Sequence, residues 1–153
     1  MIYHHDEWLD VHIGDCREAL RDINPGTIDC CVTSPPYWGL RDYGHRDQLG
    51  SEATPDEYVA NMVAVFRLVR DTLKDDGSLW LNLGDTYASR RFGDIKAKDL
   101  VGIPWRVALA LQSDGWYLRS DVIWSKPNPM PEPAHDRPSR SHEYVFQIGR
   151  AHV

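Results

Sequence analysis

The most unusual peptide in the sequence is TSPPY at 33–37. Two consecutive prolines fix their backbone torsions and remove two N–H donors, so the carbonyl oxygens of this turn are not committed to a regular ladder. The Ser34 hydroxyl and the carbonyl of Pro35 or Pro36 are hydrogen-bond acceptors, and Tyr37 adds an aromatic ring. Rigid acceptors beside an aromatic plate are suited to holding an exocyclic amino group of a nucleobase.

Such an amino group is a poor nucleophile, because its lone pair is delocalised into the ring. Acceptors around its N–H bonds draw the nitrogen toward tetrahedral geometry and free that lone pair. Tyr37 can stack on the face of a base that has been taken out of the double helix. The plainer interpretation is a proline turn that only ends a strand, and the position of 33–37 between an apolar run and a polar loop argues against it.

Strand and helix patterns alternate around this turn. Short apolar or alternating runs predict strands at 8–13, 27–32, 78–83, 116–124 and 142–148. Apolar residues at helical spacing predict helices at 16–23, 55–73 and 103–113. Thr54 and Glu57 form a T-x-x-E capping box at the start of the second helix. This order predicts an α/β domain with a mainly parallel sheet and flanking helices.

Ligands of such sheets bind at the carboxyl ends of the strands. The peptides that follow predicted strands are Gly14-Asp15, 33–37, Gly84-Asp85 and 125–129. We therefore expect these four strand ends to meet at one cleft. The roles of Asn82 and Asp85, which lie near it, are open.

Several segments together suggest a family. The peptide at 33–37 resembles the catalytic motif of the amino-group DNA methyltransferases, which modify N4 of cytosine or N6 of adenine. Four further segments resemble one bacterial and phage branch of this family, in its order: GDCREAL at 14–20, GSLWLNLGDTY at 77–87, DLVGIPWRVALAL at 99–111, and DGWYLRSDVIWSKPNPMPE at 114–132. The resemblance spans residues 9–147. It implies a partial Rossmann-like methyltransferase fold that uses S-adenosylmethionine.

The resemblance also implies roles for particular residues. Ser34, Pro35, Pro36 and Tyr37 would be catalytic, and no metal or covalent nucleophile is required. Asp15 and Thr33 would bind the cofactor. The residues that would contact the base or the DNA are Trp38, Trp124, Lys126, Asn128, Arg90 and Arg91. Some of these assignments have an alternative. Asp15 can instead be the N-cap of the helix at 16–23, and Trp124 can instead pack on the sheet. The two arginines can instead lie in a solvated loop.

The expected substrate is double-stranded DNA, methylated on cytosine N4. In the family, S-P-P-Y is commonest with cytosine N4 and D-P-P-Y with adenine N6, so adenine stays open as the alternative. Relatives that methylate RNA bases or protein glutamine resemble N-P-P-Y, which is not present here. A non-catalytic nucleic-acid-binding fragment, or one subunit of a split enzyme, is a further alternative. A restriction endonuclease is a potential partner.

The family's Gly-rich cofactor turn, D-P-F-x-G-S-G-T, has no counterpart in this sequence. In the permuted branch that turn follows the catalytic one. We therefore expect residues 1–147 to be the catalytic half of a methyltransferase domain with an open sheet edge. Residues 148–153 (IGRAHV) depart from the family pattern and resemble a translated sequencing adapter, so we expect a non-native tail.

Composition sets broader limits. The chain has 153 residues, which suits one domain, and no apolar run approaches the roughly 20 residues of a membrane helix. Its start lacks the basic region of a signal peptide. Three cysteines give no disulfide framework, so a cytoplasmic location is expected, with Cys30 and Cys31 in the core. The net charge is −6 overall, but residues 86–153 are net positive and can present a basic face.

Overall fold

The computed structural model describes residues 2–150. The elements follow in this order: β1 (Ile2–His5), β2 (Asp10–His12), α1 (Cys16–Ala19), the 3₁₀ turn η1 (Leu20–Asp22), β3 (Ile28–Thr33), α2 (Pro55–Thr72), β4 (Leu73–Leu83), α3 (Ile103–Ser113), β5 (Tyr117–Ser125) and β6 (His142–Gly149). No helix among these residues is both long and apolar enough to cross a membrane.

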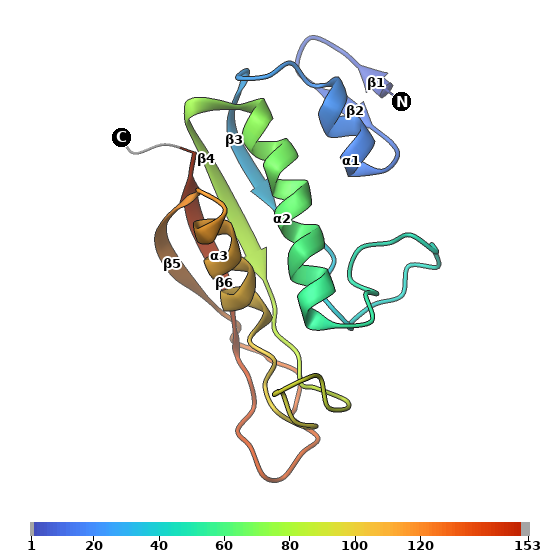
Figure 1. The fold of residues 1–153 in the computed structure, drawn as a ribbon, viewed down its shortest axis with the longest axis vertical. Coiled ribbons are helices and arrows are strands. Elements are labelled where there is room, and N and C mark those ends of the chain that lie inside the picture. Colours follow the sequence, from blue (N-terminus) through green and yellow to red (C-terminus); the bar gives the residue numbers. More distant parts are fainter. Residues whose placement is uncertain (1, 151–153) are drawn as a thin grey trace.

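The main sheet has four strands in the order β3-β4-β6-β5. β3 and β4 are parallel, and β6 lies antiparallel to both of its neighbours. Three strands, β3, β4 and β5, therefore run in the same direction, and the carboxyl ends of all three lie at one edge together with the start of β6. Both long helices, α2 and α3, cover the same face of this sheet (Figure 1). The α/β class expected from the sequence is confirmed.

The strand expected at 8–13 does not join this sheet. Its structured part, β2, pairs with β1 in a separate two-stranded antiparallel sheet. The alternating pattern was enough to indicate a strand, but it could not indicate the partner, and the nearby segment Ile2–His5 supplies one. The expectation that Gly14-Asp15 shares an edge with the other three strand ends is therefore wrong.

Helix α2 follows the expected pattern closely. Thr54 Oγ1 accepts a hydrogen bond from the Glu57 amide at 3.2 Å, and the Glu57 carboxylate accepts one from the Thr54 amide at 3.2 Å. The buried face of α2 includes Tyr58 and Phe66. That face belongs to the same core as Leu81 of β4. The capping box thus starts a helix whose apolar stripe covers the sheet.

Strand β4 is longer than expected. The sequence predicts a helix up to residue 73 and a strand from residue 78, but β4 begins at Leu73. The register explains the difference, because Ile28 is level with Leu73 whereas Cys30 is level with Ser78. A bulge within β4 accommodates the extra residues between these pairs.

The sheet face opposite the two helices is open within residues 2–150. Val32 of β3 is 79% exposed and Val122 of β5 is 45% exposed. Cys30 is also exposed, and Cys31 is half-buried. The prediction of a core position is therefore wrong for Cys30, whereas Cys31 packs against the core. β3 is an edge strand, and Cys30 faces its uncovered side.

The boundary expected after Gln147 falls inside β6. Ile148 is fully buried and is level with Leu79 of β4 and Leu118 of β5. Arg150 donates to the backbone carbonyl of Leu73. The remainder of the expected tail, 151–153, lies outside the described residues.

The capping box gives a first prediction. Replacing Thr54 by alanine removes a side-chain acceptor from an otherwise unsatisfied amide of α2, so we expect a loss of about 1 kcal/mol in the free energy of unfolding. Urea denaturation followed by circular dichroism measures it. Thr54→Ser keeps the hydroxyl and should retain most of the stability. Equal losses in the two variants would contradict the role of the cap.

Candidate active site

The turn after β3 is held from below by helix α2. The Tyr58 hydroxyl donates to the backbone carbonyl of Pro36 at 2.9 Å. Tyr58 is fully buried, and burial strongly raises the pKa of its phenol, so the group stays protonated as a donor. One of the two candidate proline acceptors, the Pro36 carbonyl, is therefore engaged by the protein. The Pro35 carbonyl is the better candidate for a ligand.

The loop that follows folds back onto the same turn. The amide of Gly39 donates to the carbonyl of Gly50 at 2.8 Å. A Cβ atom at Gly50 would lie 2.9 Å from the Tyr37 carbonyl oxygen, and Gly50 has a φ of +93°. Only glycine tolerates both the close approach and that backbone conformation.

Beyond the turn, four polar side chains form a cluster from three parts of the chain. The Tyr37 hydroxyl lies 2.8 Å from Asn82 Oδ1 and 3.1 Å from Glu143 Oε2. The Ser34 hydroxyl lies 3.1 Å from Tyr37 Oη and 3.2 Å from Asn82 Oδ1. Ser34 and Tyr37 come from the turn, Asn82 from β4 and Glu143 from β6. We call these four residues the hydroxyl cluster.

The proton count in the hydroxyl cluster restricts what Ser34 can do. The Asn82 amide nitrogen donates to the Tyr144 carbonyl at 3.1 Å and to Glu143 at 3.3 Å. This orientation leaves Asn82 Oδ1 facing the two hydroxyls as an acceptor. The single Ser34 proton can therefore point inward, to Asn82 or to Tyr37. The Ser34 lone pairs then remain available to accept hydrogen bonds from a ligand.

Lys126 and Glu143 form an ion pair at the edge of the cluster. Burial opposes ionisation of Glu143, but hydrogen bonds from Lys126, Tyr37 and Asn82 outweigh it and hold the pKa of this carboxyl below its usual value. Burial raises the pKa of Tyr37, and the neighbouring Glu143 carboxylate raises it further. Lys126, expected to contact DNA, is instead bound within the protein, because a lysine beside a half-buried carboxylate is held by it.

Trp124 lies beside the cluster. It is level with Glu143 on the neighbouring strand, and its side chain is on the same open face of the sheet. It is 58% exposed, so the alternative interpretation as sheet packing is not what the structure shows. Asn128 is exposed in the loop that follows β5. The structure thus leaves Trp124, but not Lys126, exposed beside Glu143 of the hydroxyl cluster.

Trp38 is not positioned to contact DNA. It is 7% exposed, donates from Nε1 to the Glu52 carbonyl at 2.9 Å, and packs edge-on against Phe92 at 5.2 Å between ring centroids. Its expected role in binding DNA is therefore corrected to packing under the turn. Being next to Tyr37 in sequence did not place it on the same side of the backbone.

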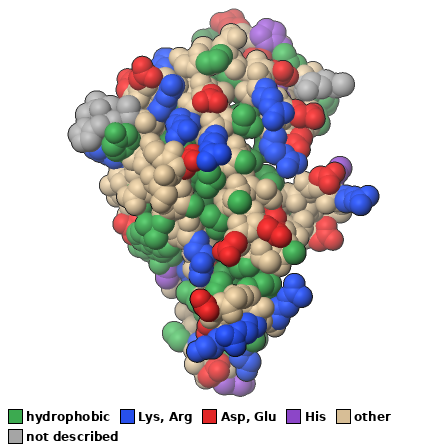
Figure 2. All heavy atoms as spheres, in the orientation of Figure 1, with side chains coloured by type: hydrophobic (Ala, Val, Ile, Leu, Met, Phe, Trp, Pro, Cys, Tyr) green, Lys and Arg blue, Asp and Glu red, His purple; other side chains and the backbone are tan. Residues whose placement is uncertain are grey.

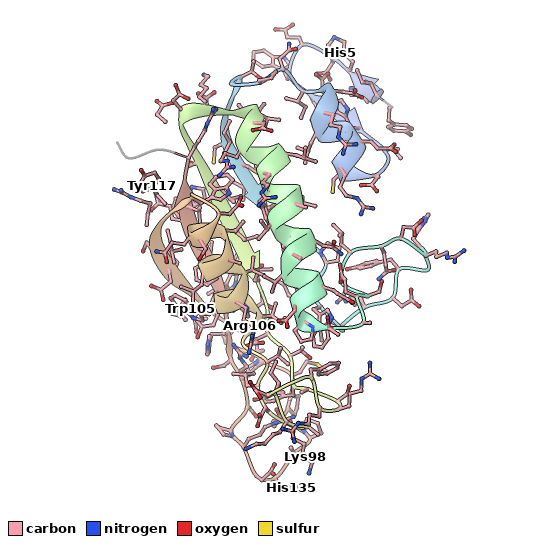
Figure 3. The ribbon with its side chains drawn as sticks, viewed as in Figure 1. His5, Lys98, Trp105, Arg106, Tyr117 and His135 are labelled. Carbon is pink, nitrogen blue, oxygen red and sulfur yellow. The ribbon has the colours of Figure 1, made fainter. Side chains whose placement is uncertain are left out.

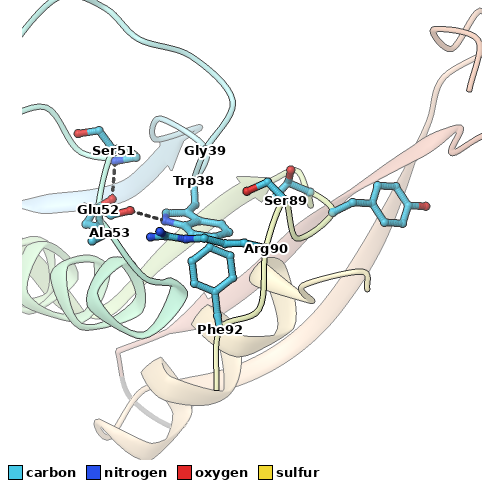
Figure 4. Close-up of a pocket in the computed structure, with 11 residues that line it drawn as sticks. Trp38, Gly39, Ser51, Glu52, Ala53, Ser89, Arg90 and Phe92 are labelled. Carbon is cyan, nitrogen blue, oxygen red and sulfur yellow. Dashed lines mark hydrogen bonds between the residues drawn. The ribbon is translucent and has the colours of Figure 1, made fainter. Parts of the chain in front are cut away.

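Trp38 forms one wall of a cavity of about 480 Å³ between two loops, which Phe92 and Arg90 also line (Figure 4). The Arg90 guanidinium lies 5.2 Å from the centre of the Phe92 ring. Arg91 Nε donates to the Gly93 carbonyl at 2.9 Å. Both arginines are exposed and remain candidates for contacts with phosphate groups.

Lys and Arg side chains gather at the lower end of the molecule in Figure 2. This end consists of the loops between β4 and α3 and between β5 and β6 (Figure 1), and Figure 3 labels Lys98 and His135 there. These loops extend from the edge of the sheet that carries the hydroxyl cluster. Part of the positive charge of the second half thus lies next to the site.

Asp15 caps α1 and is bound to Arg17. Its Oδ1 accepts from the Arg17 amide at 2.8 Å, and the Arg17 side chain donates to both carboxylate oxygens. These hydrogen bonds lower the pKa of Asp15. The alternative interpretation as an N-cap is therefore confirmed. Thr33 is the half-buried last residue of β3, level with Leu81.

Asp85 has a structural role that the sequence left open. Its Oδ1 accepts from the amides of Thr86, Gly102 and Ile103, each at 2.9 Å, and its Oδ2 lies 3.2 Å from Arg140. A carboxylate at the start of α3 is favoured by the helix dipole. Asp85 therefore joins the two basic loops to the core.

The comparisons with known proteins concern the fold and the family. The fold matches that of the PvuII DNA methyltransferase (cytosine-N4-specific), with a TM-score of 0.70 and 22% identity over 92% of this chain and 48% of that one. It also matches a Thermus thermophilus protein assigned as a DNA modification methylase and solved in complex with S-adenosyl-L-methionine, with a TM-score of 0.70 and 26% identity over 93% of this chain and 53% of that one. The fold is therefore that of the S-adenosylmethionine-dependent methyltransferases.

Sequence comparison gives the family. Residues 28–151 match the model of the N6/N4 DNA methylases, and the chain belongs to that family. It is 50% identical to the type II methyltransferase M.SmaI of Serratia marcescens, over 90% of this chain and 54% of the relative. It is 45% identical to M.Cfr9I of Citrobacter freundii, over 90% and 53%. The chain thus spans about half the length of the curated relatives it matches.

Gly84 gives a test of this geometry. A Cβ atom there would lie 2.6 Å from the Tyr37 ring, so Gly84→Ala must displace the ring. We expect this overpacking to lower the free energy of unfolding by about 1–3 kcal/mol.

The control is a double-mutant cycle, since Tyr37→Ala removes the clash. In that background Gly84→Ala should cost little, as measured by urea denaturation of all four proteins. An unchanged cost would show that the ring does not pack on Gly84.

Proposed function

We propose that this chain carries the catalytic residues of an S-adenosylmethionine-dependent DNA methyltransferase. Its substrate is the exocyclic amino group of a base extruded from double-stranded DNA. The observation that carries the proposal is the orientation of Ser34, whose only proton can be donated to Tyr37 or Asn82. The Ser34 oxygen is then an acceptor beside Tyr37 that faces away from the protein. Such an acceptor suits an amino group, which has two protons to donate.

Each part of the turn then has a task. Ser34 Oγ and the Pro35 carbonyl accept the two amino protons and draw the nitrogen toward tetrahedral geometry. Tyr37 stacks on the base, and Trp124 approaches the base from β5. The Pro36 carbonyl, held by Tyr58, keeps the acceptors in place before the substrate arrives.

The residues present fit a cationic methyl donor. The hydroxyl cluster offers oxygen acceptors, whose lone pairs suit a positive charge nearby, while Lys126 already balances the charge of its one carboxylate, Glu143. S-adenosylmethionine supplies, when bound, a methyl group on a cationic sulfur that is already an activated leaving group. Asp15 and Thr33 stay proposed contacts for this cofactor.

Cytosine N4 is the proposed target atom. The choice of cytosine rests on the serine at position 34, because the family more often carries aspartate there when adenine N6 is methylated. For DNA contacts we propose Arg90 and Arg91, which are exposed on a basic loop, and Asn128 in the loop after β5. A restriction endonuclease partner and a cytoplasmic setting are further parts of this proposal, and the relatives named above are type II methyltransferases.

The test uses the protein translated from the whole genomic reading frame that encodes these residues. Ser34→Ala removes an acceptor from the reacting amine, and we expect the rate of methyl transfer to DNA to fall by about 10²–10³-fold. Tyr37→Ala should act in the same direction through lost stacking. Methyl transfer from labelled cofactor measures both.

Two surface variants of β5, Ser120→Ala and Tyr117→Ala, are matched controls and should keep the wild-type rate. Mass spectrometry of the digested product identifies the modified nucleoside. An undiminished rate in Ser34→Ala would overturn the role of the turn, and methylated adenine would overturn the choice of cytosine.

A further inference from the structure

Methylation of an amino group leaves one proton too many. The nitrogen that attacks with its lone pair becomes positively charged and must lose a proton. The turn itself offers a hydroxyl and a carbonyl, and neither group retains an additional proton near neutral pH. The site therefore needs a base that can be reached from the amino nitrogen.

A continuous path leads from Ser34 to a carboxylate. Ser34 Oγ lies 3.1 Å from Tyr37 Oη, and Tyr37 Oη lies 3.1 Å from Glu143 Oε2. Both separations are within the range over which a hydroxyl passes a proton along a hydrogen bond. Asn82 contacts the same hydroxyls, but an amide oxygen does not take up a proton at neutral pH.

We propose that Glu143 is the proton acceptor of the site and that it acts through Tyr37 and Ser34. This inference rests on the proposed function. The amino nitrogen uses its lone pair to form a bond to the methyl carbon. The carbon–sulfur bond of the methylsulfonium donor breaks, and its electron pair stays on the sulfur. The nitrogen then gives a proton to Ser34 Oγ, the Ser34 proton moves to Tyr37 Oη, and the phenol proton moves to Glu143 Oε2. The carboxylate becomes a carboxylic acid, which later releases the proton to solvent.

The surroundings of Glu143 keep it ready for this step. Lys126 faces it from the end of β5 and Tyr37 from the turn after β3, whereas β4 contributes the neutral Asn82. Glu143 is therefore ionised before the reaction, with Lys126 as its counter-ion. A methylated, positively charged amino group of a base is a far stronger acid than a carboxylic acid, so transfer of its proton to Glu143 is energetically favourable. Within this arrangement Glu143 is a positioning residue for Tyr37 as well as the end of the path.

The first experiment needs neither cofactor nor DNA. Fluorotyrosine placed at position 37 reports the pKa of this phenol by ¹⁹F NMR. Burial and Glu143 both raise that pKa, so Glu143→Gln should lower it. Asp29→Asn is the matched control, because Asp29 also pairs with a lysine, Lys74, but at the far end of β3. An unchanged pKa in Glu143→Gln would overturn the path.

The second experiment measures single-turnover methyl transfer against pH in the whole-frame protein. Glu143→Gln should slow the step by about 100-fold while DNA affinity is kept. Lys126→Met leaves the carboxylate but removes its counter-ion, so the pKa of Glu143 rises. Because the rate is lost as pH falls through that pKa, its acid limb should move to higher pH. Lys74→Met is the control and should not move it.

The outcomes separate the two proposals. A wild-type rate in Glu143→Gln, or an acid limb that Lys126→Met does not shift, overturns the proton path and leaves the methyltransferase function standing. Absence of methyl transfer in the wild type overturns the function and the step that rests on it, while the ¹⁹F measurement still decides whether Glu143 acts on Tyr37.

Discussion

The site depends on one buried hydrogen bond, from the Tyr58 hydroxyl to the Pro36 carbonyl. A phenol that is fully buried on α2 must find an acceptor, because an unsatisfied polar group there costs about 1–3 kcal/mol. The acceptor it finds is in the catalytic turn. Through this hydrogen bond, the packing of α2 on the sheet fixes the position of the two prolines. The turn is consequently part of the core on one side and a ligand surface on the other.

Side chains along the strands alternate between the two faces of the sheet, which separates the packed core from the ligand surface. Leu81 and Leu83 of β4 point toward the helices and are fully buried, so Asn82 between them points to the open face. Glu143 and Trp124, which are level with each other on β6 and β5, share that face. The helix-covered face supplies rigidity, and polar groups on the opposite face can be exchanged without disturbing the core.

Local signals in the sequence were sufficient for the elements and for the turn. The capping box of Thr54 and the apolar stripe of α2 are short-range patterns, and two prolines after a strand constrain the backbone by themselves. The partners of Tyr37 are different, since Asn82 and Glu143 lie 45 and 106 positions away along the chain. Such partners depend on strand order and register, and a single sequence carries no pattern for either. A polar residue between two leucines, as in Leu81-Asn82-Leu83, was the one available hint.

The errors have the same origin. Trp38 follows Tyr37 directly, yet it turns into the core, because neighbouring residues in an extended turn point to opposite sides. Cys30 lies in an apolar run, but both long helices cover the other face of its sheet, so its side chain is exposed. Lys126 follows a strand end that faces the ligand side, yet a carboxylate within reach binds it first. In each case the residue type was read correctly and its neighbour was not. A charged or aromatic residue beside a catalytic motif therefore indicates a contact only after the competing contacts inside the protein have been counted.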